Sequence, residues 1–202
     1  MSARLGRPHG AEESQPRYAR PVSTPPEYLA LRAKLDSFAA SVSVRRADGM
    51  RCGPGCDACC RVQLSLCDLE ADVLREGLKQ LEPEVKLQLA AEPEDPARCA
   101  LLDPGGRCRA YDARPLVCRS QGLPLRYPPD VVPASAVRAR AEGGEITWCP
   151  LNFEADPPEP DDVLDAERVD LILAMLNRRE AAEPLRRTPI QTLIRELAPD
   201  RR

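Results

Sequence analysis

Nine cysteines stand against a single histidine in this chain of 202 residues, and this ratio limits its chemistry. The histidine, His9, lies in an N-terminal segment that is rich in Pro and Arg and has almost no apolar periodicity. Catalysis that needs a histidine base, such as a Cys–His nucleophile pair or an HExxH zinc peptidase, is therefore excluded. An odd number of cysteines also cannot pair completely as disulfides within one chain.

The remaining composition favours a cytoplasmic protein. Residues 1–25 contain no apolar core of a signal peptide. The longest strongly apolar run, residues 171–176, is far shorter than the roughly 20 residues that a membrane helix needs. A formal net charge of −3 and a pI near 5.4 argue against nucleic acid or an anionic membrane as the main partner. In a reducing cytoplasm, clustered cysteines are more typical of metal ligands or redox groups than of disulfides.

Apolar periodicity predicts helices at both ends of the chain around a cysteine-bearing centre with little regular structure. We expect a disordered tail over residues 1–25 and a single metal-binding domain over residues 26–200. The fold class is a mostly α, small metal-stabilised α(+β) domain with an irregular or β-hairpin cysteine-rich centre. The expected elements are a helix from a capping box at Thr24 to about Arg45, a short strand over 62–66, a helix capped by Asp68 that breaks and restarts at Pro83, a hairpin between Cys99 and Cys118, mostly irregular chain over 122–160 with a helical patch near 135–141, and closing helices over 163–176 and from Thr188 to Leu197.

The densest cysteine cluster is the string CGPGCDACC, which holds Cys52, Cys56, Cys59 and Cys60. A glycine-rich loop allows backbone N–H groups to approach thiolate sulfurs, which lowers the cost of gathering their charges. Cys59 and Cys60 are adjacent, so we expect their side chains to diverge, and one ion would not easily take both in tetrahedral geometry. The string predicts either two nearby metal sites or one polynuclear cluster reached from two sides.

Four further cysteines lie beside turn or loop residues and complete a set of eight candidate ligands. The predicted hairpin would bring Cys99 and Cys108 together, and Cys118 and Cys149 follow it in the chain. Eight thiols are enough for two four-thiolate centres. Cys67 is left over, and its position after an apolar run indicates a small buried residue.

Three strings together resemble a known family, the YkgJ-type cysteine-cluster proteins, which are also described as a CxxCxxCC zinc- or iron-chelating domain. They are CGPGCDACC, then CALLDPGGRCRAYDARPLVCRSQGLPL from Cys99, and CPLNF from Cys149. The resemblance runs from about Tyr28 to Leu197. It implies a cytoplasmic protein with a Cys-ligated iron–sulfur cluster, of 4Fe-4S type, or Zn²⁺, in a redox or metal-handling role. The family pattern carries over directly to Cys52, Cys56, Cys59, Cys60, Cys99, Cys108 and Cys118, whereas Cys149 matches only a subset of relatives. Between Cys52 and Cys56 this sequence has three residues, where the family name has two.

The same family string contains Tyr111, Arg114 and Arg119. Four thiolates around a divalent metal carry a net charge of about −2, and neighbouring guanidinium groups would offset it and hydrogen-bond to sulfur. These three residues are therefore candidates for binding around the cofactor. Arg114 could equally cap backbone carbonyls or pair with Asp112 on the surface.

Other function classes remain open from the sequence, and whether the protein is an enzyme is not decided by it. A structural four-cysteine zinc module for protein interaction needs no catalysis. Some family relatives are similar to a flagellin lysine N-methylase. The C-x3-C-x2-C spacing and the string Gly143–Glu145 (GGE) resemble radical S-adenosylmethionine enzymes, although Ala58 stands where those have an aromatic residue. Dithiol–disulfide switching at Cys59 and Cys60 is a further class.

Overall fold

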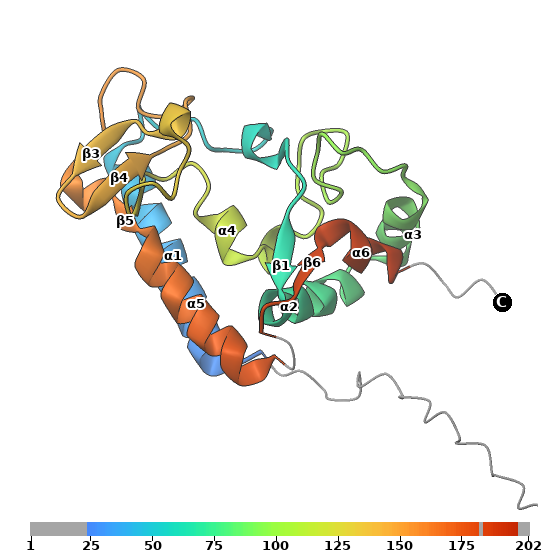
Figure 1. The fold of residues 1–202 in the computed structure, drawn as a ribbon. Helices are drawn as coiled ribbons and strands as arrows, with labels where there is room; N and C mark the ends of the chain where they lie inside the picture. The colour runs from blue at the N-terminus through green and yellow to red at the C-terminus, as the bar shows by residue number, and fades with distance from the viewer. Residues whose placement is uncertain (1–23, 182–183, 198–202) are drawn as a thin grey trace, which may run out of the picture.

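The structure is a computed structural model and describes residues 24–181 and 184–197. The expected disordered tail lies outside the described residues except for Thr24 and Pro25. The described chain forms a mixture of helices and small sheets, in which helices predominate (Figure 1). The helices are α1 Pro26–Arg45, α2 Asp68–Lys79, α3 Pro83–Ala91, α4 Leu116–Arg119, α5 Ala166–Glu180 and α6 Ile190–Arg195. The strands are β1 Ser65–Cys67, β2 Leu125–Tyr127, β3 Ala139–Ala141, β4 Gly144–Thr147, β5 Leu164–Asp165 and β6 Arg187–Pro189.

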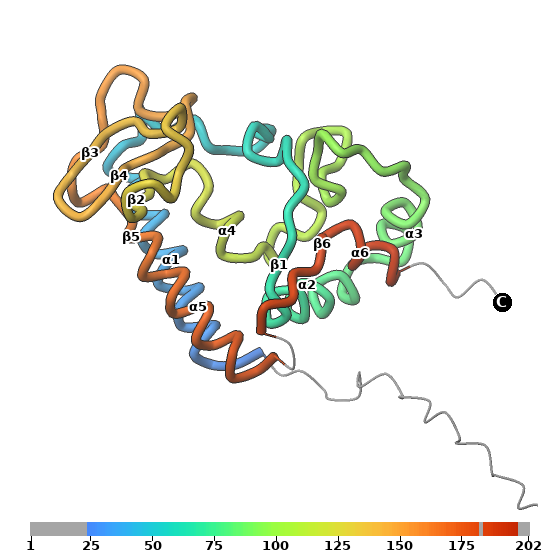
Figure 2. Tube along the Cα trace, viewed as in Figure 1, coloured from blue at the N-terminus to red at the C-terminus, as the bar shows by residue number. Residues whose placement is uncertain are grey.

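Two apolar clusters divide the molecule into two halves. In the first, α1 and α5 lie side by side, and Tyr28, Leu35 and Val42 of α1 are almost completely buried. The second gathers α2, α3 and α6 around residues such as Leu66 and Ile190. Figure 2 shows that the chain after α1 crosses from the first half to the second before it enters β1. The loop that carries Cys52 to Cys60 therefore bridges the two halves.

Helix α2 contributes side chains to both clusters. Its residues Leu69 and Val73 belong to the first cluster, and Leu74 and Leu78 belong to the second. An α-helix has 3.6 residues per turn, so residues four positions apart share a face, whereas neighbouring residues face different sides. The two faces of α2 therefore connect the two halves of the core.

A buried carboxylate joins three of the helices. Glu70 of α2 is 4% exposed, and its Oε1 accepts hydrogen bonds from the Tyr28 hydroxyl at 3.2 Å and the Leu116 N–H at 2.7 Å. Burial raises the pKa of Glu70 and that of Tyr28. Because Leu116 opens α4, this contact fixes α4 against both α1 and α2.

The segment between Gly122 and Pro160 is more regular than its sequence predicts. It supplies three strands of a four-stranded sheet with the order β3-β4-β2-β5, in which β2 and β5 are parallel and the other pairs are antiparallel. The predicted helical patch near Ser135–Ala141 is wrong, because this stretch contains a single 3-10 turn, Ala134–Ala136, followed by β3. Strands of three or four residues are too short to show an apolar alternation and depend on their pairing partners.

The other predicted helices are present, with α5 starting at Ala166 and not at 163, but the predicted caps Thr24 and Asp68 are not the N-cap residues. Pro25, Cys67 and Pro189 occupy the N-cap positions of α1, α2 and α6, and none of them caps through its side chain. Asp68 instead accepts a hydrogen bond from Arg186 at 2.8 Å. The break at Pro83 is confirmed by the start of α3 there. Within the described part of the chain, no helix has both the length and the apolar character to cross a membrane.

An ionic clasp holds the end of α1, from which the first cysteine loop departs. Asp162 is 1% exposed and accepts hydrogen bonds from Arg45 Nη2 at 2.9 Å and Arg46 Nε at 2.5 Å. Its Oδ2 also accepts the Glu159 N–H at 3.0 Å. The clasp therefore ties α1 to the segment that leads into β5 and α5.

The clasp predicts a pH-dependent stability. Burial alone would raise the pKa of Asp162, but the hydrogen bonds and charges of Arg46 and Arg45 hold it below the ordinary value of 3.8. A carboxylate with a depressed pKa in the folded state stabilises the fold above its ordinary pKa, and this contribution is lost as the pH falls through the folded-state value. Asp162→Asn should lower the free energy of unfolding at neutral pH by about 2 kcal/mol.

Chemical denaturation of the wild-type protein and Asp162→Asn at pH about 7 and pH about 3 tests this prediction. The difference between the two proteins should shrink at the lower pH, because below the ordinary pKa of 3.8 the carboxylate of the unfolded chain takes up a proton and the advantage of the folded-state charge is progressively lost. A difference that stays constant between the two pH values would contradict the role assigned to the Asp162 charge.

Candidate metal centre

The first cysteine loop follows α1 and contains two tight turns. The Cys56 N–H donates to the Gly53 carbonyl at 3.0 Å, and the Cys60 N–H donates to the Asp57 carbonyl at 2.8 Å. The second turn forms a short 3-10 helix, Ala58–Cys60. The loop therefore positions its four cysteines with tight turns, and its longest regular element is this 3-10 turn of three residues.

The second cysteine loop is the predicted hairpin, which is confirmed. Leu102 and Cys108 form an antiparallel bridge, and Asp103 N–H donates to the Arg107 carbonyl at 2.8 Å across the turn. The Cys99 N–H donates to the carbonyl of Cys60 at 2.7 Å. This backbone contact brings the hairpin directly against the first loop.

Cys118 reaches the hairpin from the short helix α4. Its N–H donates to the Pro115 carbonyl at 3.0 Å, and α4 is itself fixed by the contact between Glu70 and the Leu116 N–H. Burial raises the pKa of Cys118 to about 12, and the charges of Cys99 and Cys108 contribute further. A thiol in this position is protonated at neutral pH unless a cation offsets its charge.

Cys149 reaches the first loop through Asn152, a residue that the sequence did not single out. The Asn152 N–H donates to the Cys149 carbonyl at 3.0 Å, and its side-chain Nδ2 donates to Cys52 Sγ at 3.2 Å. Gly122, with a φ of +90°, also lies against this sulfur, because a Cβ at position 122 would be 2.3 Å from Cys52 Sγ. The only sequence feature that could have indicated this role is the position of Asn152 three residues after Cys149, and it does not predict a contact with Cys52.

We divide the eight predicted ligands into two groups by their electrostatic effects on one another. The pKa of Cys52 is raised by burial and by the charges of Cys56, Cys149 and Cys59, and Cys60 lies within electrostatic reach of the hairpin thiols and Cys118. We call Cys52, Cys56, Cys59 and Cys149 the first thiol group, and Cys60, Cys99, Cys108 and Cys118 the second thiol group.

The contact between the two groups differs from the expectation. The thiols of Cys59 and Cys60 share a hydrogen bond, which raises the pKa of Cys59 and lowers that of Cys60, whereas divergence of the two side chains was expected. The charge of Cys59 also raises the pKa of Cys99, although burial and the charge of Cys108 raise it more. The two groups are therefore neighbours in space.

The donor set fits a thiophilic metal. Backbone N–H groups of Leu101 and Ala110 hydrogen-bond to Cys99 and Cys108 and oppose the rise in pKa that burial causes. Such N–H···S bonds stabilise thiolates, and thiolates select zinc and iron–sulfur clusters. As positioned in residues 24–181 and 184–197, no three Cys, His, Asp or Glu side chains stand close enough to hold one metal ion.

Comparison with known proteins supports metal binding. Residues 51–135 match the model of the family CxxCxxCC, described as a putative zinc- or iron-chelating domain. This segment is similar to the CxxCxxCC domain. A search of curated proteins found no match, and neither did a search of solved structures. The matched segment is shorter than the expected resemblance from Tyr28 to Leu197, and it does not include Cys149 or Asn152.

The charge of Arg114 acts on cysteines of both thiol groups. Its positive charge opposes the rise in pKa that other causes, burial foremost, produce at Cys108 and Cys118, and it acts in the same direction at Cys59. Its guanidinium carbon is 3.5 Å from the ring centroid of Tyr111, and its Nε donates to the Tyr111 carbonyl at 3.0 Å. Arg114 therefore caps a carbonyl, as the alternative interpretation has it, and its charge also lowers the pKa of nearby thiols.

Arg119 has a different set of partners. Its side chain is 8% exposed, and its Nη1 donates to both carboxylate oxygens of Asp36 at 2.9 Å. Its remaining donors bind the carbonyls of Arg114 and Asp112. These contacts attach the chain around Arg114 to α1, so the contacts of Arg119 are structural and none of them involves a thiol.

Cys67 lies apart from both thiol groups. It is 6% exposed in β1, and burial raises its pKa. The neighbouring groups that affect its ionisation are Glu70, Arg187 and Asp68. This placement agrees with the interpretation of Cys67 as a small buried residue.

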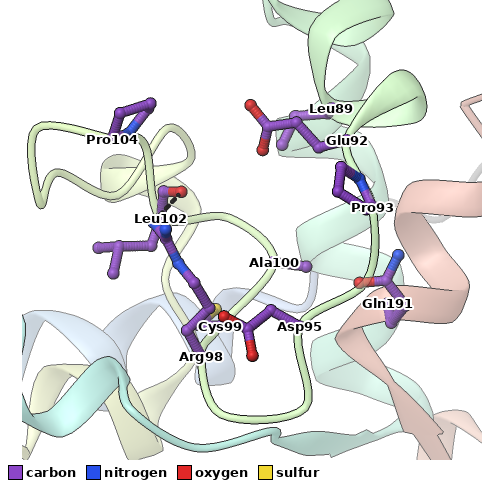
Figure 3. Close-up of a pocket in the computed structure, with 10 residues that line it drawn as sticks. All are labelled: Leu89, Glu92, Pro93, Asp95, Arg98, Cys99, Ala100, Leu102, Pro104 and Gln191. Carbon is purple, nitrogen blue, oxygen red and sulfur yellow. Dashed lines mark hydrogen bonds between the residues drawn. The ribbon is translucent and has the colours of Figure 1, made fainter.

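A cavity opens beside the second thiol group. It has a volume of about 340 Å³, and Cys99 lines it together with Arg98 and Asp95 (Figure 3). Gln191 of α6 borders the same cavity, and its Oε1 is buried without a hydrogen-bond partner among the described residues. The cavity therefore adjoins the second thiol group at Cys99, one of its four predicted ligands.

The close packing of α2 against the CxxCxxCC loops predicts an unusual response to a glycine substitution. A Cβ at Gly77 would lie 2.2 Å from the Cβ of Ala113, in the 3-10 turn Tyr111–Ala113 that precedes α4. Ala normally stabilises a helix by about 1 kcal/mol relative to Gly. Gly77→Ala should instead destabilise the protein by about 1–3 kcal/mol, because it overpacks this contact.

A double-mutant cycle measured by urea denaturation tests this contact. Ala113→Gly removes the opposing methyl group, so the double variant Gly77→Ala/Ala113→Gly should recover most of the free energy of unfolding that Gly77→Ala loses. Additive effects of the two substitutions would show that the two residues do not pack against each other.

Proposed function

We propose that the CxxCxxCC domain and Cys149 together form two neighbouring metal centres, each ligated by four cysteines. The first thiol group would ligate one centre, and the second thiol group would ligate the other. The proposal is supported by two contacts: the Cys99 N–H donates to the Cys60 carbonyl at 2.7 Å, and Asn152 joins Cys52 Sγ at 3.2 Å to the Cys149 carbonyl at 3.0 Å. The effects of neighbouring thiols on the pKa of Cys52 and of Cys60 agree with this division. Each group has the ligand number that four-thiolate centres require.

Iron–sulfur clusters, of 4Fe-4S type, are the occupants that we assign to these centres. The ligand sets contain thiols alone, and hydrogen bonds to sulfur come from Asn152, Leu101 and Ala110. Arg114 supplies a positive charge beside both groups. When bound, such a cluster supplies a one-electron redox centre whose potential depends on hydrogen bonds to sulfur and on solvent exposure. The corresponding role is redox or metal handling in the cytoplasm.

A structural zinc module is the second candidate. The loops over residues 46–64 and 98–115 connect the two apolar clusters, yet they contain only short 3-10 turns and an isolated bridge. Zinc bound to four thiolates can replace a hydrophobic core in a segment of this kind. In that role the metal would hold the two halves of the molecule together.

The GGE string is explained by local structure. Gly144 and Glu145 begin strand β4, and the Glu145 carboxylate pairs with Arg140 at 2.9 Å and accepts the Asp130 N–H at 3.3 Å. A Cβ at Gly144 would lie 2.1 Å from the carbonyl oxygen of Tyr127. These contacts account for the residues within the sheet, so our proposal includes no radical S-adenosylmethionine activity.

Anaerobic purification followed by metal and acid-labile sulfide analysis tests the occupants. Two 4Fe-4S clusters would give about eight iron and about eight sulfide per chain, with a broad visible absorption and an EPR signal on reduction. About two zinc without sulfide would reject the clusters in favour of the structural zinc module. The absence of stoichiometric iron and zinc would reject the metal-binding proposal.

Single cysteine substitutions test the division into two centres. Cys149→Ser should lose the centre of the first thiol group and keep the other, and Cys108→Ser should do the reverse, so each variant keeps about half of the metal. Cys67→Ser is the matched control and should keep all of it, because Cys67 belongs to neither group. Complete loss of metal in both ligand variants would favour one polynuclear cluster over two centres.

A further inference from the structure

We infer that Asn152 is a positioning residue for the proposed metal centre of the first thiol group, holding the Cys52 sulfur by an N–H···S hydrogen bond. The inference rests on the proposed function, because it assigns the source of a contact to one of its ligands. Asn152 lies outside the segment that matches the CxxCxxCC family. It therefore extends the site to a part of the chain that the family match does not cover.

The orientation of the Asn152 amide is fixed by its partners. Its Oδ1 accepts the Arg51 N–H at 2.8 Å, and its Nδ2 donates to the Gly122 carbonyl at 2.8 Å. A backbone N–H can only donate and a carbonyl can only accept, so the opposite orientation would lose both bonds. The NH₂ group must therefore be the end that faces Cys52 Sγ.

Burial makes this arrangement rigid. Asn152 is 1% exposed, and a buried amide that loses its hydrogen bonds cannot replace them with water. Gly122 closes the other side of the sulfur, since a Cβ there would be 2.3 Å from Cys52 Sγ and 3.1 Å from the Asn152 Nδ2. Only a residue without a side chain leaves space for both the sulfur and the amide that binds it.

Asn152 also connects two ligands of the same group. Its side chain contacts Cys52 Sγ and the N–H of Arg51, and its own N–H donates to the Cys149 carbonyl at 3.0 Å. The next residue, Phe153, donates its N–H to the Gly49 carbonyl at 2.9 Å. Residues 49–52 and 149–153 are therefore held together by bonds that do not require metal.

A hydrogen bond to a thiolate draws electron density from sulfur and lowers the energy of its lone pairs. The bond therefore stabilises the deprotonated ligand, and contacts of this kind typically change metal affinity by about 10–100-fold. In the Co²⁺-substituted protein, loss of the bond should also shift the sulfur-to-cobalt charge-transfer band of the first thiol group to lower energy. Unfolding or loosening of the chain does not by itself produce a shift in that direction.

The test compares Asn152→Leu with the matched control Asn177→Leu, using Co²⁺ alone as the probe. Asn177 is 3% exposed, and it uses Oδ1 to accept the Leu69 N–H and Nδ2 to donate to the Pro184 carbonyl, both at 2.9 Å. It thus resembles Asn152 in burial and bonding, but its side-chain hydrogen bonds within the described chain go to backbone groups and not to a thiol. Asn152→Leu should weaken Co²⁺ binding at one of two sites by about 10–100-fold and shift its band, whereas Asn177→Leu should leave both unchanged.

A second measurement needs no variant and keeps the inference testable if Asn152→Leu does not fold. In the wild-type protein loaded with ¹¹³Cd²⁺, an Asn152 Hδ2 proton should show scalar coupling to cadmium across the N–H···S bond. Bound cadmium without this coupling would overturn the inference, as would equal Co²⁺ affinities and spectra of the two leucine variants. A wild-type protein that binds neither Co²⁺ nor Cd²⁺ would instead reject the proposed thiolate centres themselves.

Discussion

Gathering eight thiols in one small region has an electrostatic cost, and much of the structure offsets it. Burial raises the pKa of Cys52, Cys99, Cys108 and Cys118, and neighbouring thiolate charges raise several of these values further. The fold supplies backbone and side-chain N–H donors and the charge of Arg114 in the same region. These contributions only reduce the cost. A bound cation would remove most of it, which explains why loops of this composition suit a metal.

The scaffold around the thiols explains why such irregular loops hold their positions. Each loop begins or ends at a residue fixed by a buried ionic or hydrogen-bonded contact. The clasp at Asp162 fixes the end of α1 ahead of Cys52, and Glu70 fixes the start of α4 ahead of Cys118. Asn152 fixes the chain after Cys149. Polar contacts therefore perform the role in these loops that apolar packing performs in the helices.

The predictable parts of the fold are those determined by local sequence. The helical spacing of Tyr28, Leu31, Leu35, Phe38 and Val42 predicted α1. Phe38 is partly buried against the first cluster, and the other four residues are buried. The sheet was not predictable, because β2 to β4 are short and contain charged or glycine residues, and they form only through pairing between distant segments.

The same distinction applies to the candidate site. The eight cysteines could be selected from their spacing and loop context, and the hairpin was predicted from its turn residues. The proposed assignment of Cys149 to the group of Cys52 could not be predicted from the sequence, because it depends on Asn152 and on the close approach of Gly122 to the Cys52 sulfur. The boundaries of α2 were predictable, but its first residue was mistaken for the cap, since an aspartate at that position is compatible with either role.

The shared helix α2 has a consequence for any attempt to transplant this site. The family segment 51–135 contains both faces of α2, but the partners of those faces, α1 and α5 on one side and α6 on the other, lie outside it. Excised alone, the segment would expose Leu69 and Leu74 to water and leave Glu70 without the Tyr28 hydroxyl. We therefore expect a transplanted site to need the chain from α1 to α6, which is considerably longer than the segment that matches the family.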